Sequence, residues 1–380
     1  MVAVLVALLI GLAIPQATPA ASGLQASIAA LGSFDFKTRT EASRRLRREP
    51  AAVVVPALEA AARSHADEYV RFRAMVLLSG LDPGATTRVA TDLVADRNDR
   101  VRAVAYQWFE RHPESSILPR LLAALPEETS EFVRPALTRA LASSGRDPAV
   151  QQALRPLVLK GEDLFRGSVI AALGDHAGDY ALEELLAVVS LDGPLQDDAI
   201  TAIGQIGRPS SRGAVAALQK DAPPHLQPTV SAALCLLQLD CPARVKFVVE
   251  TVRFAAASDG QLPLLRGAVH AAGVLAGAGH NAAFDAMVDA ALAADGAVRD
   301  TITLGVGNVI LDQPLLALQL FEARKEPAAV AGVFRDAFDM LAEDFDKEQF
   351  GAEVRRLLQT APEGAARRQA AASLLDALEF

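Results

Sequence analysis

The chain has 380 residues and a formal net charge of −9, and 51% of its residues are hydrophobic while 22% are charged. This composition excludes a disordered chain and argues against a nucleic-acid-binding protein, which needs a basic face to neutralise phosphates. Ala and Leu, which have the best helix propensity, fill nearly every segment, and Val and Ile seldom alternate with polar residues. The sequence therefore predicts an all-α fold.

The first segment, residues 2–14, is continuously apolar (VAVLVALLIGLAI) and is followed by Pro15 and the small residues ATPAAS, although no Lys or Arg precedes it. This pattern indicates a secretory signal peptide with its cleavage zone. Thirteen apolar residues are too few to span a bilayer comfortably, so we expect cleavage rather than an anchor. We predict that residues 1–21 are a signal peptide, that residues 22–380 carry no membrane span, and that the protein is periplasmic or secreted.

Charged residues gather near both ends of the chain that follows. Residues 37–48 contain six basic side chains against one acid, and residues 336–348 contain six acids. We interpret the basic stretch as the solvated face of a terminal repeat, with a patch for an anionic partner as the alternative. The acidic stretch is what an end-capping repeat needs for solubility. The basic residues are Lys37, Arg39, Arg44, Arg45, Arg47 and Arg48, and the acids are Asp336, Asp339, Glu343, Asp344, Asp346 and Glu348.

An internal repeat with a period close to 32 residues extends through the chain. The pattern "apolar, Arg, two residues, apolar" recurs, and apolar residues such as Leu173 stand three and seven positions after each marked residue, on one helical face. A second amphipathic helix fits between successive marks, which predicts about ten stacked helix pairs. The marked residues are Arg39, Arg71, Arg102, Arg134, Arg166, Asp197, Thr229, Arg266, Arg299, Arg335 and Arg367.

The spacing is longer before two of the marks, with 37 residues before Arg266 and 36 before Arg335. Such insertions over the common period predict kinks in the array, near residues 240–262 and 312–332.

Four of the marked arginines follow an acid by three residues. An acid at this position would lie at the helix N-terminus, where it caps free backbone N–H groups and meets the positive end of the helix dipole. The arginine one turn later can pair with this acid or with its counterpart in the next repeat. We interpret the ladder as structural, because it recurs at the repeat period. The pairs are Glu68 with Arg71, Asp99 with Arg102, Glu131 with Arg134 and Asp163 with Arg166.

The stretches AALGDHAGDYALEELLAVV (171–189) and AITAIGQIGRPSSRGAVAALQ (199–219) resemble HEAT repeats of the short, lyase-like bacterial type. This type pairs helices around an "A-L-G-x-x-G" turn after a "V-R-x-x-A" helix start, which is seen in VRAVAYQWF (101–109) and YVRFRAMVLLSGLDPGA (69–85). The resemblance covers most of residues 35–375. It implies a right-handed α-solenoid (an α-α superhelix) with a scaffold or partner-binding role, and it carries over no catalytic residue.

No motif of a catalytic, metal or nucleotide site stands out, since HExxH, CxxC, CxxCH and GxSxG are missing from the sequence. Asp175, His176 and Asp179 offer two carboxylates and an imidazole to a metal ion. They fall in a turn between helices, where polar residues are expected anyway, and a persuasive site would have four well-spaced ligands. We therefore expect no catalytic residue, no cofactor and no metal.

The two cysteines, Cys235 and Cys241, leave two possibilities open. On one helix they would lie about 9 Å apart, beyond disulfide reach. Pro242 suggests that the helix ends before Cys241, and a chain reversal there would bring the two closer. The alternative is a buried Cys235 and a free thiol in a loop.

Tyr106, Trp108 and Phe109 form the densest aromatic cluster of the sequence. Phe109 occupies a core position of the repeat, whereas the other two lie on different faces of the helix. A tryptophan that half-faces solvent is a common interface anchor, so Tyr106 and Trp108 are our candidates for partner binding. The alternative is that both rings fill gaps between neighbouring repeats.

These observations predict a non-enzymatic scaffold or adaptor that binds another exported protein or peptide on the concave surface of the solenoid. Repeats of this kind expose a long curved surface and no deep pocket, so binding should involve several repeats and no single titratable residue. The alternatives are an enzyme accessory or lyase-like maturation factor acting on a protein substrate, and attachment to a cell-surface polymer. We expect no nucleic-acid partner.

Overall fold

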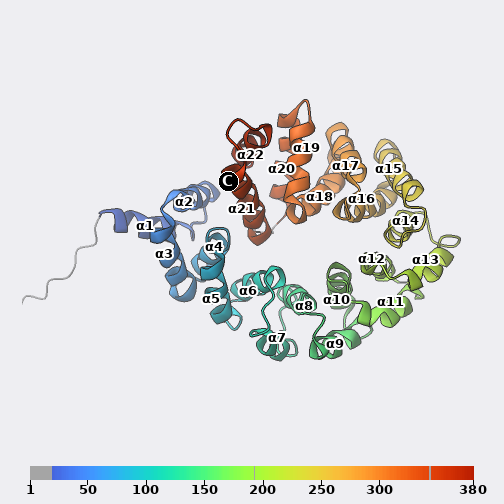
Figure 1. The fold of residues 1–380 in the computed structure, drawn as a ribbon, viewed down its shortest axis with the longest axis horizontal. Helices are drawn as coiled ribbons and strands as arrows, with labels where there is room; N and C mark the ends of the chain where they lie inside the picture. The colour runs from blue at the N-terminus through green and yellow to red at the C-terminus, as the bar shows by residue number, and fades with distance from the viewer. Residues whose placement is uncertain (1–18, 192, 342–343) are drawn as a thin grey trace, which may run out of the picture.

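The computed structural model describes residues 19–191, 193–341 and 344–380. Within them it contains twenty-two α-helices, three short 3₁₀-helices and no strand, which confirms the predicted all-α solenoid (Figure 1). Most of the predicted signal peptide, residues 1–18, lies outside the described residues. The first helix, α1 (Pro19–Ala30), begins within the expected cleavage zone.

The helices form pairs, and from α3 to α18 the even-numbered helices lie on the inside of the array and the odd-numbered ones on the outside (Figure 1). Consecutive inner helices contact one another from α4 to α18. The outer helices are α3 (Ala51–Ser64), α5 (Pro83–Leu93), α7 (Leu118–Ala124), α9 (Pro148–Leu154), α11 (Leu182–Val189), α13 (Arg212–Leu218), α15 (Cys241–Ala257) and α17 (Asn281–Ala293). The inner helices are α4 (Glu68–Ser79), α6 (Asp99–Arg111), α8 (Arg134–Ala142), α10 (Asp163–Asp175), α12 (Gln196–Ile206), α14 (Gln227–Leu236), α16 (Leu262–Gly277) and α18 (Gly296–Asp312).

Before and after this regular part lie α1, α2 (Phe36–Arg48), α19 (Pro314–Ala323), α20 (Pro327–Met340), α21 (Asp344–Thr360) and α22 (Ala366–Ala377). The 3₁₀-helices η1 (Arg155–Val158), η2 (Asp179–Ala181) and η3 (Pro209–Ser211) flank the short outer helices.

The repeat register predicted from the sequence is confirmed, because every marked residue lies on an even-numbered helix. The apolar positions after the marks are buried between helices: in α10, Val169 and Leu173 are both 0% exposed. Small residues let neighbouring inner helices approach closely. A Cβ atom on Gly204 of α12 would lie 2.7 Å from the Cα of Ala233 in α14, so a larger side chain there would push the two repeats apart.

The recurring arginines join each inner helix to the turns around it. Arg71 donates a hydrogen bond to the carbonyl of His65 in the turn that precedes its helix, and its guanidinium pairs with Asp96 of the next repeat at 3.0 Å. Arg102 repeats this arrangement with both carboxylate oxygens of Glu128, at 2.8 and 2.9 Å.

The predicted ladder is confirmed only for Arg166, which pairs with Asp163 at 2.9 Å. Arg71 and Arg102 pair instead with Asp96 and Glu128, which lie three residues before the expected acids of the next repeat. Arg134 lies over the ring of Phe165 at 3.7 Å.

The acids three residues before the marks lie at helix starts as predicted for α4, α6 and α10, but they are the first helical residues. The capping hydrogen bonds of α4 and α6 come from the preceding Asp67 and Asn98.

The first predicted insertion appears as a longer outer helix, because α15 has 17 residues and the preceding outer helix α13 has 7. The second falls after α18, in the stretch that holds α19 and the start of α20. After α18 the chain bends sharply, and α19 lies at 115° to it. No single described helix is long and apolar enough to cross a membrane. Taken together, α18 and α19 have the length and apolar composition of a span, but the bend separates them.

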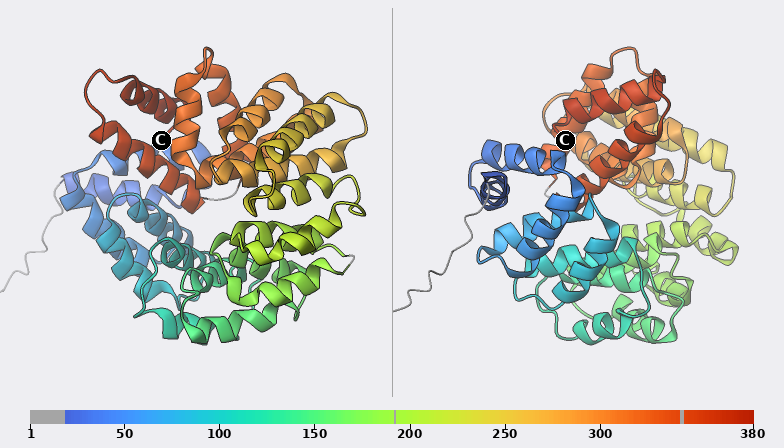
Figure 2. Two further views of the ribbon diagram at one scale, coloured as in Figure 1. Left: turned by 45° about the vertical axis from the view of Figure 1, so that its right-hand side comes forward. Right: turned by 60° about the vertical axis from the view of Figure 1, so that its left-hand side comes forward.

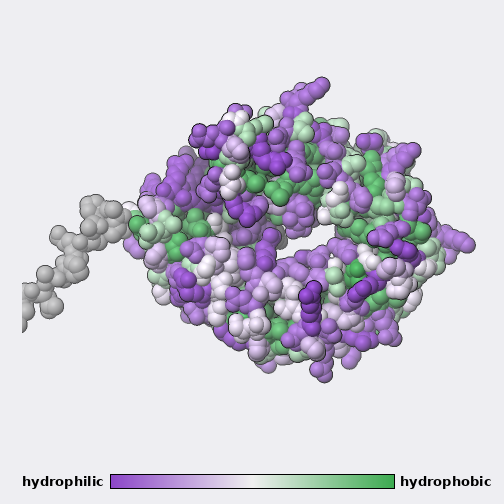
Figure 3. Space-filling model, in the orientation of Figure 1, coloured by the Kyte–Doolittle hydropathy of each residue, from purple (hydrophilic) through white to green (hydrophobic). Residues whose placement is uncertain are grey.

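The array closes into a ring because its last helices return to its first (Figures 1 and 2). The regular alternation ends after α18: α21 contacts both α18 and α4, while α22 packs on α19 and α20. Phe345 of α21 is 1% exposed and belongs to the apolar core formed by residues 28–172. The concave surface expected from the sequence is thus the inner wall of a closed ring, with an opening in the middle (Figure 3).

Candidate partner-binding surfaces of the ring

The contact between the two ends of the chain, which we call the seam, is made largely of arginines from α2, α4 and α6 and acids from the C-terminal helices. The ion pairs are Arg44 with Glu379, Arg47 with Glu348, Arg73 with Asp344 and Arg111 with Asp346. The interpretation of both terminal stretches as solvated faces is therefore wrong for these residues. Arg44 and Arg47 of the basic stretch find their anionic partners in the C-terminal end of the same chain, whereas Lys37, Arg45 and Arg48 are exposed as expected.

Glu348 lies at the centre of the seam. Its side chain is 2% exposed and accepts hydrogen bonds from Arg47 of α2 and, at 2.7 Å, from Arg355 of its own helix. A Cβ atom on Gly80, just after α4, would lie 2.4 Å from a carboxylate oxygen of Glu348 and 2.9 Å from its Cγ. Since Glu348 is held by two arginines and cannot move aside cheaply, the N-terminal repeats must present a glycine here.

A second group of charged side chains comes from α6, α8, α10, α18 and α21. The first three of these helices lie opposite the last two across the ring (Figure 1). Charges on all five helices act on one another: the field at Arg139 of α8 comes from acids on α6, α10, α18 and α21. We call this group the inner cluster. It consists of Glu110, Arg111, Arg139, Asp175, His176, Asp312 and Asp346.

Most members of the inner cluster are paired. Arg139 lies 2.8 Å from Asp175 and 3.8 Å from Glu110, and His176 Nε2 lies 3.2 Å from the same Glu110 carboxylate. Burial acts to lower the pKa of Arg139, but the surrounding carboxylates outweigh it and raise that pKa above its usual value. The side chain of Arg139 nevertheless remains 40% exposed.

Asp312, the last residue of α18, has no ion-pair partner among the described residues. Burial raises its pKa to about 6, while Arg111 opposes the shift and Asp346 adds to it. Asp312 is nonetheless exposed, so the protein that surrounds it raises this pKa without removing the residue from solvent. With four carboxylates against two arginines and one histidine, the inner cluster has a surplus of acid.

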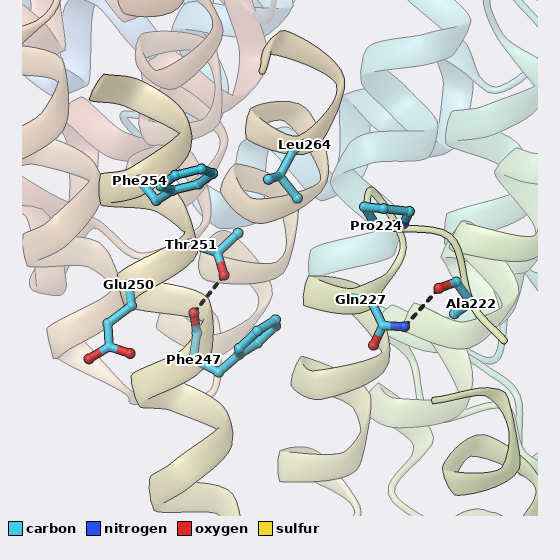
Figure 4. Close-up of a pocket in the computed structure, with 8 residues that line it drawn as sticks. All are labelled: Ala222, Pro224, Gln227, Phe247, Glu250, Thr251, Phe254 and Leu264. Atoms are coloured by element: carbon cyan, nitrogen blue, oxygen red, sulfur yellow. Dashed lines mark hydrogen bonds between the residues drawn. The ribbon is translucent and has the colours of Figure 1, made fainter. Parts of the chain in front are cut away.

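A shallow groove of about 460 Å³ lies away from the inner cluster, between the turn before α14 and the long outer helix α15 (Figure 4). Phe247 and Phe254 project from α15 into it and are 41% and 58% exposed. α15, which forms one side of the groove, has 17 residues, whereas the preceding outer helix α13 has 7. Its other lining residues are Ala222, Pro224, Gln227, Glu250, Thr251 and Leu264.

Residues 87–174 match the sequence signature of HEAT repeats. This segment of the chain contains HEAT repeats. Similar solved structures include importin beta in an ammonium sulfate condition, at 14% identity and a TM-score of 0.39, with 94% of this chain and 61% of importin beta covered. The chain thus spans less than two thirds of importin beta. The complex of CpcE and CpcF of phycocyanin lyase from Nostoc sp. PCC7120 matches at 17% identity and a TM-score of 0.28, over 86% of this chain and 96% of that one. No curated protein matches the sequence.

The candidate metal ligands of the sequence do not converge in the HEAT-repeat ring. Asp175 pairs with Arg139, His176 with Glu110 and Asp179 with Arg208. Two of the three belong to the inner cluster, and Asp179 lies at the start of η2.

The proposed anchors Tyr106 and Trp108 are not on the surface, because each is 1% exposed. The Tyr106 hydroxyl donates to the carbonyl of Val94 at 2.9 Å, and Trp108 Nε1 donates to Thr87 Oγ1 at 3.0 Å. Our expectation of exposure was wrong because α6 packs against α4, α5 and α8, which bury most of its circumference. The alternative interpretation, that the rings fill space between repeats, describes them correctly.

The two cysteines form a disulfide, which decides between the alternatives left open by the sequence. α14 ends at Leu236, and Gln238 and Asp240 then adopt left-handed backbone conformations, with φ of +62° and +52°. This tight reversal places Cys241 at the start of α15, with its Cα 4.0 Å from that of Cys235.

Proposed function

We propose that the HEAT-repeat ring is a non-enzymatic scaffold that binds a basic, extended segment of another exported protein at its inner wall. The observation that carries this proposal is the inner cluster, in which side chains from five helices converge with a surplus of acid. A ligand at this place contacts several repeats at once, which is how solenoids usually bind their partners. Electrostatic complementarity would select a basic segment and speed its association.

The test is the binding of a fluorescent, arginine- and lysine-rich peptide to the purified chain, measured by anisotropy. We expect saturable binding that weakens as salt is added, and little binding of a peptide of the same length in which glutamate replaces the basic residues. Asp312→Asn should weaken binding severalfold, because it removes an unpaired carboxylate from the inner wall. The matched control is Asp259→Asn, which removes an exposed carboxylate from the turn between α15 and α16.

The apolar groove supplies the competing location. Phe254→Ala truncates its most exposed aromatic ring and leaves the inner wall unchanged. If this variant loses the peptide while Asp312→Asn retains it, the binding surface is the groove and the proposal is wrong. Equal binding of the acidic and basic peptides would also contradict it.

The alternative function, an enzyme accessory or lyase-like maturation factor, has one supporting observation. A carboxyl group with a pKa of about 6, such as that of Asp312, can exchange a proton near neutral pH. For this alternative to hold, Asp312→Asn must abolish turnover of a protein substrate while leaving its binding intact.

A further inference from the structure

His280 lies against the disulfide at the junction of two repeats. Its Nε2 atom is 3.4 Å from Sγ of Cys235 and 3.5 Å from Sγ of Cys241. Cys235 comes from α14 and Cys241 from the start of α15, whereas His280 immediately precedes α17, so the three side chains join two successive repeats. One ligand atom from each residue lies within 4.8 Å of the others.

We propose that this trio, once the disulfide is reduced, binds a single Zn²⁺ ion through two thiolates and one imidazole. In a tetrahedral zinc site with Zn–S bonds of about 2.3 Å and Zn–N bonds of about 2.0 Å, the nitrogen lies about 3.5 Å from each sulfur. The distances from His280 Nε2 to both sulfurs already have this value. Only the two sulfurs must separate, to about 3.8 Å.

The surroundings suit a metal with sulfur ligands. Cys235 is 3% exposed and belongs to the apolar core of the C-terminal half, while Cys241 and His280 are half-buried. Two thiolates, a neutral imidazole and Zn²⁺ have no net charge, so the loaded site is compatible with this apolar corner, whereas two bare thiolates are not. The partial exposure of two ligands leaves room for water or a partner atom in the fourth position.

The ligands are also held in position by the backbone. The turn with Gln238 and Asp240 fixes the two cysteines, and the backbone N–H of His280 donates to the carbonyl of Leu275 at 3.0 Å. The site formed by Cys235, Cys241 and His280 can therefore exist in two cross-linked forms, a disulfide and a zinc thiolate. Each form links the two ends of the chain reversal between α14 and α15.

The disulfide is converted into the zinc thiolate in two steps, reduction and metal binding. A phosphine reductant takes the oxygen of one water molecule to become a phosphine oxide, the S–S bond breaks, and the two hydrogens of that water go to the sulfurs. Zn²⁺ then displaces both thiol protons, so two protons are released for each ion bound.

The experiment uses the full chain, reduced with a phosphine under anaerobic conditions and freed of excess reductant. Co²⁺, the spectroscopic substitute for zinc, is titrated into it. We expect one Co²⁺ per chain with the visible absorption bands of tetrahedral thiolate coordination, displaced by one equivalent of Zn²⁺. The oxidised chain should give no such bands. If the reduced chain gives none either, or if the oxidised chain binds equally well, the proposal is wrong.

Single substitutions separate this site from metal binding elsewhere. Cys241→Ser should abolish the thiolate bands. His280→Ala should weaken zinc binding by at least roughly 10- to 100-fold, because loss of a hydrogen-bond partner of a ligand already costs a metal site that much and His280 is itself a ligand. His225→Ala, which removes a histidine from the turn before α14, is the matched control and should bind normally. Circular dichroism shows whether each variant is folded. Unchanged affinity in a folded His280→Ala chain would remove the imidazole from the site and overturn the proposal.

Discussion

The middle repeats, from α10 to α14, are stabilised by apolar side chains packed between neighbours, whereas the seam combines the buried ring of Phe345 with ion pairs between residues far apart in sequence, such as Arg47 and Glu348. In the middle, each repeat contacts its neighbours in sequence, and one pattern serves them all. At the seam, single residues carry the contact and no pattern repeats. The two regions should therefore respond differently to substitution: the first by unfolding, the second by opening.

The largest effect is expected from Leu173→Asp in the middle region. Leu173 is 0% exposed, so the substitution places a carboxylate without a partner between helices and costs at least about 3 kcal/mol. Because stability in an array depends on neighbouring repeats, helices α8 to α12 should lose protection together. Thermal unfolding and hydrogen exchange measure both effects.

The control for this change is Leu164→Asp on the same helix, where the leucine is 72% exposed. This variant should unfold at nearly the wild-type temperature. If Leu173→Asp melted like Leu164→Asp, the side chain of Leu173 would not be buried as described.

An intermediate effect is expected from Glu348→Ala at the seam. Removing one member of a buried ion pair leaves Arg47 and Arg355 without their shared carboxylate, which costs about 3 kcal/mol or more. This loss should open the ring, so small-angle scattering should show a larger maximum dimension while circular dichroism shows the same helix content. Glu353→Ala on the same helix removes a more exposed acid whose ion pair, with Arg356, lies within α21, and it should leave the ring closed. An unchanged scattering curve for Glu348→Ala would mean that the ion pairs do not hold the seam.

The smallest effect concerns pH at the inner wall. The pKa of Asp312 is raised to about 6 in the folded chain, above the value of 3.8 for an unperturbed aspartate, so between pH 4 and 6 the folded state binds more protons than the unfolded state. The contribution of Asp312 to stability therefore falls as pH rises through this window. Since the side chain is exposed to water, we expect a difference below about 1 kcal/mol. Denaturant unfolding of wild type and Asp312→Asn at pH 4.5 and 7 should show the wild type losing more stability, and parallel curves would contradict this.

The fold could be predicted from the sequence wherever the same side-chain pattern returns in every repeat. Leu173 is buried as expected because its position recurs at the repeat period. Arg102 also stands at a recurring position and is paired, but with Glu128 in place of the expected Asp99 or Glu131. The pattern predicts a single buried stripe on each inner helix. Because α6 contacts other helices on several sides, Tyr106 and Trp108, which lie outside that stripe, are buried although we expected them to be exposed.

The inner cluster and the seam could not be derived from periodicity, because they depend on the total curvature of the array. Small differences in tilt at each repeat decide whether two ends meet, and no local pattern encodes their sum. A signal was nevertheless present: a basic stretch at one end of the chain and an acidic stretch at the other, which pair through Arg47 and Glu348. Considering the two stretches together, instead of each as a separate cap, would have suggested closure.

Closure also changes the mechanics of the array. In an open solenoid each pair of neighbouring repeats can tilt independently, and a change of tilt simply alters the distance between the two ends. In a closed ring the tilts must add up to a full circle, so a change at one junction has to be compensated at another or borne by the contact between α21 and α4. Strain at any junction of the ring therefore also acts on the contact between α21 and α4, and a force applied to the inner wall would load that contact as well.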